Sequence, residues 1–134
     1  VRNYIDIEKE NKLDKIETYY KFAKDVNNIK LKSLKKLNNI LLENKKIIGY
    51  GAPAKATTVL NYFGIDDNYF QYVLEDSEIK HNKYIPETNI QIKSKNEINV
   101  DKYEYILVLA WNFFEAIVDN NKTKFKKSKF IKLK

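Results

Sequence analysis

The sequence predicts an α/β fold with a Rossmann-like, mostly parallel sheet and flanking helices, preceded by two amphipathic N-terminal helices. Three observations support this prediction. Residues 4–43 contain no Gly or Pro, and their apolar residues recur at helical spacing. After Asn44, short apolar runs alternate with helical segments, a pattern typical of parallel strands joined by crossover helices. A glycine-rich turn, GYGAPAK, follows the first of these runs.

The N-terminal segment is interpreted as two helices because Asn27 and Asn28, which tolerate turns, interrupt its apolar pattern. We expect these helices, within residues 1–44, to pack on the sheet or to link it to an upstream domain. Residues 45–134 are expected to form the Rossmann-like core. The two parts together are predicted to make one domain.

Strands are predicted where short apolar runs occur, at 47–48, 69–74, 105–109 and 130–133, with a further short strand at 90–92. Helices are predicted between them at 54–63 and 113–121, with a short one near 96–100. The intervening charged segment at 75–89 contains Pro86 and is predicted to be a long loop.

The composition is that of one folded domain without a metal site. With 134 residues, 43% of them hydrophobic, the chain is long enough to bury a single core. It contains no Cys, which excludes a disulfide, a thiolate zinc site and a cysteine nucleophile. The single histidine, His81, excludes a His-cluster metal site and is more typical of a surface loop residue than of a catalyst.

The chain has no segment approaching the roughly 20 apolar residues needed to span a bilayer, and no signal pattern at its amino terminus. We therefore expect a cytoplasmic protein with no membrane partner. The start at Val1 and the lack of methionine suggest a fragment of a larger enzyme.

The formal net charge of +7 raises the question of a nucleic-acid partner. The lysines, however, are scattered through the helices beside Glu and Asp, and are not clustered with aromatic residues as in single-strand binders. The charge distribution therefore favours a solvated basic surface, and no nucleic-acid partner is predicted.

The segment at 45–56 has the strand, turn and helix order that gives a glycine-rich turn a mechanical role. Gly49, Gly51 and Ala54 match G-x-G-x-x-A, in which small residues allow a tight turn, close ligand approach and close helix packing. The helix that begins near Pro53 directs free N–H groups into the same space, and Lys55 adds a mobile positive charge. The turn predicts phosphate or nucleotide binding, with a purely structural tight turn as the alternative.

Two further features are expected at the same edge of the sheet. Glu75 and Asp76 end the second long strand, where a dinucleotide site has an acid that binds ribose hydroxyls. Ala110, Trp111 and Asn112 follow the third long strand. The indole of Trp111 is suited to stack on a base or sugar ring, and Asn112 is suited either to bind ligand or to cap the next helix.

Four segments share the order and spacing of one protein family: GYGAPAKATTVLNYFGI at 49–65, YVLEDSEIKHNKYIP at 72–86, YEYILVLAWN at 103–112 and the final KFIKLK. On these segments the chain resembles the C-terminal domain of S-adenosylmethionine-dependent sugar C-methyltransferases, which modify nucleotide-linked deoxysugars. The resemblance implies a metal-binding N-terminal domain, a central domain that holds S-adenosylmethionine and the catalytic base, and this domain closing over the sugar nucleotide. It assigns no catalytic residue and no cofactor to this fragment, which is expected to be inactive alone.

The resemblance and the pattern of the turn together predict the substrate-binding residues Gly49, Tyr50, Gly51, Ala52, Pro53, Ala54, Lys55, Glu75, Trp111 and Asn112. The expected partners are a nucleotide sugar and the upstream catalytic domain of the same polypeptide. The sequence also departs from the family, since Glu75-Asp76-Ser77 replace Asp-Arg-Asn, Asn82 replaces a Gly that precedes Lys-Tyr, and Glu87-Thr88 replace Gly-Thr. Asn82 is still able to adopt a left-handed conformation.

A second interpretation treats the chain as the NAD(P)-binding Rossmann half of an oxidoreductase. The G-x-G-x-x-A pattern and Glu75 support it, but a second mononucleotide-binding half and a convincing proton donor are missing from the sequence.

Overall fold

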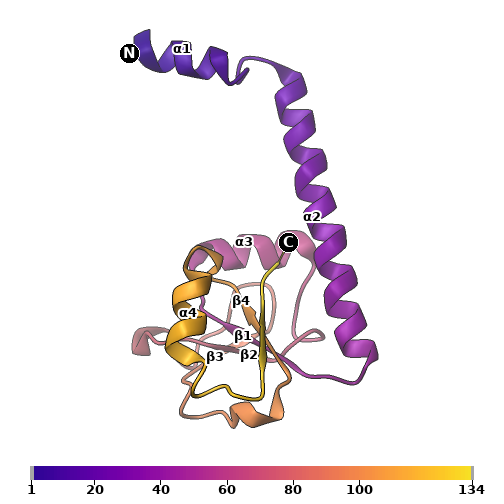
Figure 1. Cartoon of the computed structure of the whole chain (residues 1–134), viewed down its shortest axis with the longest axis vertical. Helices are drawn as coiled ribbons and strands as arrows, with labels where there is room; N and C mark the ends of the chain where they lie inside the picture. The colour runs from indigo at the N-terminus through magenta and orange to yellow at the C-terminus, as the bar shows by residue number, and fades with distance from the viewer. Residues whose placement is uncertain (1, 134) are drawn as a thin grey trace.

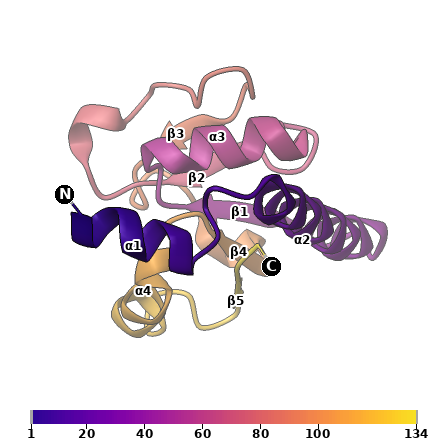
Figure 2. The ribbon, with the colours of Figure 1, turned by 90° about the horizontal axis from the view of Figure 1, so that it is seen from above.

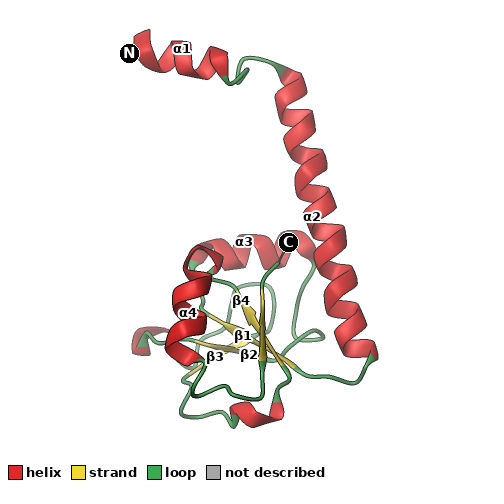
Figure 3. Ribbon diagram, in the orientation of Figure 1, coloured by secondary structure: helices red, strands yellow, loops and turns green. Residues whose placement is uncertain are grey.

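The structure, a computed structural model, describes residues 2–133 and contains five strands and four α-helices within that range (Figure 1). The elements follow the order α1 (Arg2–Glu10), α2 (Ile16–Leu42), β1 (Ile47–Tyr50), α3 (Ala54–Phe63), β2 (Tyr72–Leu74), β3 (Gln91–Lys93), β4 (Tyr105–Val108), α4 (Phe114–Asn121) and β5 (Lys129–Ile131). Three short 3₁₀ helices lie between them: η1 (Glu78–Lys80), η2 (Val100–Lys102) and η3 (Trp111–Phe113). Figure 3 shows the strands together in the globular part of the molecule, with α3, α4 and the lower half of α2 around them.

The five strands form one parallel sheet in the order β3-β2-β1-β4-β5. Gly49 on the central strand β1 is paired with Val73 of β2 on one side and with Leu107 of β4 on the other. The chain runs outward from β1 in both directions, so β1 and β4 border the topological switch point, where ligands bind in open α/β sheets. The predicted α/β class and parallel sheet are confirmed.

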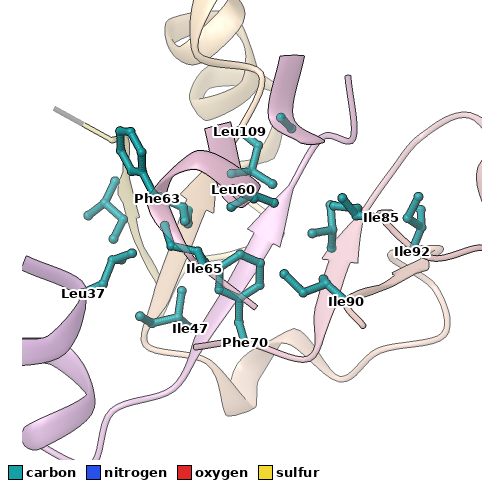
Figure 4. Close-up of a cluster of buried hydrophobic side chains, with 14 of the residues drawn as sticks. Leu37, Ile47, Leu60, Phe63, Ile65, Phe70, Ile85, Ile90, Ile92 and Leu109 are labelled. Carbon is teal, nitrogen blue, oxygen red and sulfur yellow. The ribbon is translucent and has the colours of Figure 1, made fainter. Parts of the chain in front are cut away.

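Helices cover both faces of the sheet, and Figure 2 shows α3 and α4 on opposite sides of it. Side chains alternate between the two faces of the sheet along a strand. In β1, Ile47 therefore packs in the cluster beneath α2 and α3, and Ile48 packs in the cluster on the α4 side. Figure 4 shows the first cluster, in which Leu60 and Phe63 of α3 approach Leu37 of α2. Burying a side chain of this size contributes roughly 1.5–3 kcal/mol.

The predicted helix break at Asn27 and Asn28 is wrong, because α2 runs through both residues without interruption. The two asparagines are exposed, so each costs only the modest propensity penalty of about 0.7 kcal/mol, which a long cooperative helix tolerates. The break lies instead at residues 11–15, where Lys12 has a φ of 55°.

Several strand and helix bounds differ from the predicted ones. The second strand begins at Tyr72, because Tyr69 and Phe70 belong to the turn before it. The short helix expected near 96–100 is the 3₁₀ helix η2, and the helix expected from Phe113 begins as the 3₁₀ helix η3. These shifts of a few residues arise because apolar packing continues past the last residue that forms ladder hydrogen bonds.

The loop between β2 and β3 explains two of the departures from the resembled family. Asn82 and Glu87 stand where that family has glycine, and both have positive φ, 61° and 64°. Asn82 therefore adopts the left-handed conformation expected for it. Next to Glu87, the buried Thr88 secures the turn, because its Oγ1 donates to the Ile85 carbonyl at 2.9 Å and accepts from the Ile90 N–H at 3.2 Å.

The buried part of the N-terminal helices is the second half of α2. Ser33, Leu37 and Ile40 are its buried residues, and all lie in that half. Figure 1 shows α1 and the first half of α2 projecting away from the sheet.

Candidate functional site

The glycine-rich turn lies at the carboxyl end of β1, against the segment that follows β4. Gly51 has a φ of 84°, and its N–H donates to the Leu74 carbonyl at 2.7 Å. A Cβ at this position would lie 2.9 Å from the Cβ of Ala110. The expected proximity of the turn and residues 110–112 is therefore confirmed. The close contact that requires glycine at position 51 is with Ala110 of the same chain.

Gly49 is required for a different contact. A Cβ there would lie 2.6 Å from Cγ2 of Val73 and 3.2 Å from the ring of Phe70, both on the neighbouring strand segment. Both glycines of the G-x-G pair thus have structural roles in addition to any role in ligand binding.

The first turn of α3 presents free backbone donors beside this turn. Pro53 is the N-cap residue with extended backbone and no side-chain cap, and the Ala56 N–H donates to its carbonyl at 2.8 Å. Within residues 2–133, the N–H groups of Ala54 and Lys55 have no backbone partner. Together with the positive end of the helix dipole, they form a site suited to an anion.

Glu75 organises the opposite wall of the site. One carboxylate oxygen, Oε2, accepts from the Ala52 N–H at 2.8 Å, and the other, Oε1, accepts from the N–H groups of Asp76 at 3.0 Å and Ser77 at 3.1 Å. Lys80 donates to Glu75 Oε2 at 3.3 Å and to the Ala52 carbonyl at 3.2 Å. Glu75 thereby ties the glycine turn to the end of β2.

These contacts set the charge of Glu75. Burial alone would raise its pKa, but the hydrogen bonds from Ala52 and Ser77 and the nearby Lys80 ammonium outweigh burial and hold the pKa below its ordinary value. Glu75 is therefore ionised at neutral pH. Its negative charge favours hydroxyl groups over phosphate in the part of the site that it faces.

We predict that Glu75→Gln lowers the free energy of unfolding by about 1–2 kcal/mol at pH 7, because an amide has one carbonyl oxygen and leaves donors on one side unpaired. Since the folded-state pKa is lowered, the carboxylate stabilises the fold above the ordinary glutamate pKa, and this stabilisation is lost as the pH falls through the lowered value. Urea unfolding of both proteins checks this. The difference should shrink on acidification, and a constant difference would contradict it.

Lys80→Met is the matched control, because it removes the ion pair and keeps the three backbone hydrogen bonds to Glu75. The Lys80 side chain is 38% exposed, so its loss should cost less than 1 kcal/mol, as is usual for partly solvated pairs.

Tyr50 joins the turn to a polar cluster that the sequence analysis missed. The phenol donates to Asp76 Oδ2 at 2.9 Å, lies 3.4 Å from Asn121 Oδ1 and accepts from Lys95 at 3.3 Å. Lys95 also pairs with Asp76 at 2.7 Å. Burial, followed by the hydrogen bond to Asp76, raises the pKa of Tyr50, so the phenol stays protonated.

Lys80, Lys95 and Asn121 are therefore residues of the site region that were not predicted. Lys95 and Asn121 are 45 and 71 positions away from Tyr50 in the sequence, and neither belongs to a motif. His81 is held by a structural contact, with its Nε2 2.8 Å from the Glu75 carbonyl oxygen.

Trp111 and Lys55 contact each other. The Lys55 ammonium lies 4.4 Å from the centroid of the Trp111 ring, a cation–π arrangement. Asn112 is exposed in η3, and neither η3 nor α4 has a side-chain cap, so the capping role considered for Asn112 is not realised.

Six of the ten predicted residues line one of two hollows, and Gly49, Ala54, Lys55 and Asn112 line neither. The glycine hollow, about 240 Å³, is lined by Tyr50, Gly51, Ala52, Pro53, Glu75, Asp76, Lys80, Ala110, Phe113 and Ile117. A second hollow of about the same volume, 240 Å³, lies on the α3 side and is lined by Ile29, Val59, Phe63, Trp111 and Leu133. Lys55, in the first turn of α3, is in contact with Trp111 and belongs to the same helix terminus as the free N–H groups.

Residues 2–133 contain neither a membrane-spanning helix nor a metal-binding cluster. No helix in this range is both long and apolar enough to cross a membrane. In the same range, no group of three or more His, Cys, Asp or Glu side chains is arranged to hold a metal ion.

The sequence comparisons agree with one another. A model of the C-methyltransferase C-terminal domain matches residues 1–133. The chain is also similar to the C-methyltransferase NovU of Streptomyces niveus, with 27% identity over 104 residues. That alignment covers 78% of this chain and 25% of NovU, so the chain spans about a quarter of the length of this curated relative.

These matches do not favour the oxidoreductase interpretation. They agree with the family resemblance of the four segments and with the parallel sheet. The chain belongs to the C-methyltransferase C-terminal domain family.

Proposed function

We propose that this chain is the substrate-binding part of an S-adenosylmethionine-dependent C-methyltransferase that acts on a nucleotide-linked sugar. The observation that carries the proposal is that the glycine turn at the switch point leads directly into the free N–H groups of α3 and Lys55, while the ionised carboxylate of Glu75 is bonded to the same turn at Ala52. Anion-binding and hydroxyl-binding groups side by side suit a ligand that joins a diphosphate to sugars. The proposed contacts come from Gly49, Tyr50, Gly51, Ala52, Pro53, Ala54, Lys55, Glu75, Trp111 and Asn112.

The charges suggest how such a ligand lies. The N–H groups of Ala54 and Lys55 and the Lys55 ammonium would bind phosphate oxygens. Glu75 would accept a hydrogen bond from a sugar or ribose hydroxyl in place of the one that Lys80 donates to its Oε2, and its charge would keep phosphate away from this part of the site. Trp111 would offer a ring face once the ammonium of Lys55 turns to the phosphate.

In this proposal the methyl donor and the catalytic base belong to a domain upstream in the same polypeptide, and this chain alone has no activity. The glycine hollow, at about 240 Å³, is smaller than the roughly 300–1,000 Å³ of typical ligand pockets. A second domain closing over it would complete the enclosure. We also propose that the protein is cytoplasmic, because nucleotide-linked sugars and S-adenosylmethionine are cytoplasmic metabolites.

Calorimetric titration of the 134-residue chain tests this proposal. The ligands are dTDP, UDP, GDP and CDP, with S-adenosylmethionine and NAD as comparison ligands. We expect saturable binding of at least one nucleoside diphosphate and none of the methyl donor. Binding of NAD alone would favour the oxidoreductase, and the failure of all four diphosphates to bind would contradict a nucleotide site in this chain.

A further inference from the structure

A second feature of the surface has no role in the proposed ligand site. A hollow of about 450 Å³ lies between α2 and α3 and is almost entirely apolar, lined by Phe22, Ala23, Val26, Ile29, Thr58, Val59, Tyr62 and Phe63. It shares Ile29, Val59 and Phe63 with the hollow beside Trp111. The two hollows therefore form one apolar groove, here called the α2–α3 groove, that runs from α2 to the proposed ligand site.

The walls of the groove are fixed in the folded chain. The Lys30 ammonium donates to the Tyr62 carbonyl at 2.7 Å and lies 5.1 Å from the Tyr62 ring centroid, which ties α2 to the end of α3. About two helical turns beyond Lys30, Leu37 is buried in the same hydrophobic cluster as Leu60 and Phe63 of α3. The groove is thus preformed, which lowers the entropic cost of filling it.

Exposed apolar side chains are concentrated in the projecting helices. Among residues 3–133, ten of the fifteen exposed large hydrophobic side chains lie between positions 4 and 31: Tyr4, Ile5, Ile7, Leu13, Ile16, Tyr19, Tyr20, Phe22, Ile29 and Leu31. Two of them, Phe22 and Ile29, line the groove itself. A hollow lined by apolar side chains and flanked by such a concentration is typical of an interaction site, whereas single exposed hydrophobic residues are not.

We propose that the α2–α3 groove binds the catalytic, methyl-donor-binding domain of the same polypeptide. This inference rests on the proposed function, which puts that domain upstream of α1. Three quarters of the length of NovU lies outside the segment matched by this chain, so that relative has ample polypeptide to supply such a domain. A domain joined to α1 is tethered to the same chain, at the end of the helices that project from the sheet (Figure 1), and tethering raises its effective concentration at the groove above that of a free partner.

The position and charge of the groove define the surface that would fill it. Its far end is formed by Trp111, against which Lys55 lies, so a domain bound here also borders the proposed phosphate site. Lys30 and Lys55 flank the groove with positive charge. The complementary surface is an apolar ridge with carboxylates at its rim, and its docking brings the methyl donor to the substrate.

Hydrogen–deuterium exchange of the full-length gene product, compared with the 134-residue chain, tests the inference. Both are measured without nucleotide or methyl donor, so the result does not depend on the identity of the substrate. We expect amides of residues 19–31 and 58–63 to exchange at least about tenfold more slowly in the full-length protein, because a covered helix opens less often. Equal exchange in the two proteins would overturn the inference.

Two other results would also overturn it. One is a gene product no longer than these 134 residues. The other is concentration-dependent dimerisation of the 134-residue chain with the same amides protected, which would assign the groove to a second copy.

A pair of variants locates the contact. Phe22→Asp puts a charge into the groove at an exposed position, and Ile79→Asp, which is 78% exposed in η1 outside the groove, is the matched control. In the full-length protein, Phe22→Asp should restore most of the rapid exchange, and Ile79→Asp should leave the protection intact. Circular dichroism of the 134-residue variants checks that both retain their helices. Protection that survives Phe22→Asp would contradict docking in this groove.

Discussion

Gly51→Ala is expected to lower the free energy of unfolding by about 2–5 kcal/mol and to abolish ligand binding at the glycine turn. Two costs add. The φ of 84° costs an L-residue roughly 1–2 kcal/mol, and the new Cβ, 2.9 Å from the Cβ of Ala110, costs about 1–3 kcal/mol of overpacking. Ala110 cannot move freely because it follows the buried Leu109. Urea unfolding followed by Trp111 fluorescence measures the change.

Gly64→Ala separates the two costs. Gly64 has a similar φ of 74°, but a Cβ there would meet no atom within 4 Å. Its replacement should therefore cost only the backbone part, roughly 1–2 kcal/mol, and should leave ligand binding unchanged. Equal losses in the two variants would show that contact with Ala110 does not constrain the turn.

Lys55→Ala is expected to weaken nucleoside diphosphate binding by about 1.5–3 kcal/mol, which is roughly tenfold to a hundredfold in affinity. The ammonium is at the N-terminus of α3 and is held over Trp111, without an ion-pair partner among residues 2–133. It is therefore available for a charge-assisted hydrogen bond to a phosphate oxygen. Calorimetry with the diphosphate that binds the parent chain measures the effect.

Lys126→Ala is the control, because it removes the same charge from an exposed residue in the turn before β5. Long-range electrostatics alone would weaken binding equally in both variants, and this weakening would fade with added salt. An equal loss would therefore rule out a direct contact from Lys55.

The parallel sheet and its order of elements could be predicted from the sequence because the strands are short apolar runs and helical segments follow β1 and β4. The error at Asn27 and Asn28 shows the limit of that approach. A residue that tolerates turns does not create one in the middle of a long helix, whereas the actual break, at Lys12, ends a short polar stretch at 8–12 that contains no Gly or Pro to mark it.

The candidate site could be predicted only in part. The glycine turn and the residues after β4 lie together as expected, because the carboxyl ends of parallel strands share an edge of the sheet. The links of Tyr50 to Lys95 and Asn121 depend on where α4 and the loop after β3 pack, which no local pattern encodes. The same holds for Lys80, whose two contacts depend on the course of the loop after β2.

If the glycine turn is the ligand site of this chain, its backbone amides respond when ligand binds. Amide chemical shifts of the ¹⁵N-labelled 134-residue chain are therefore recorded while a nucleoside diphosphate is added. We expect saturable shifts centred on Gly51, Ala54 and Lys55, with the Trp111 indole N–H also affected. Shifts confined to the lysine-rich outer face of α2, or no shifts at millimolar ligand, would contradict it.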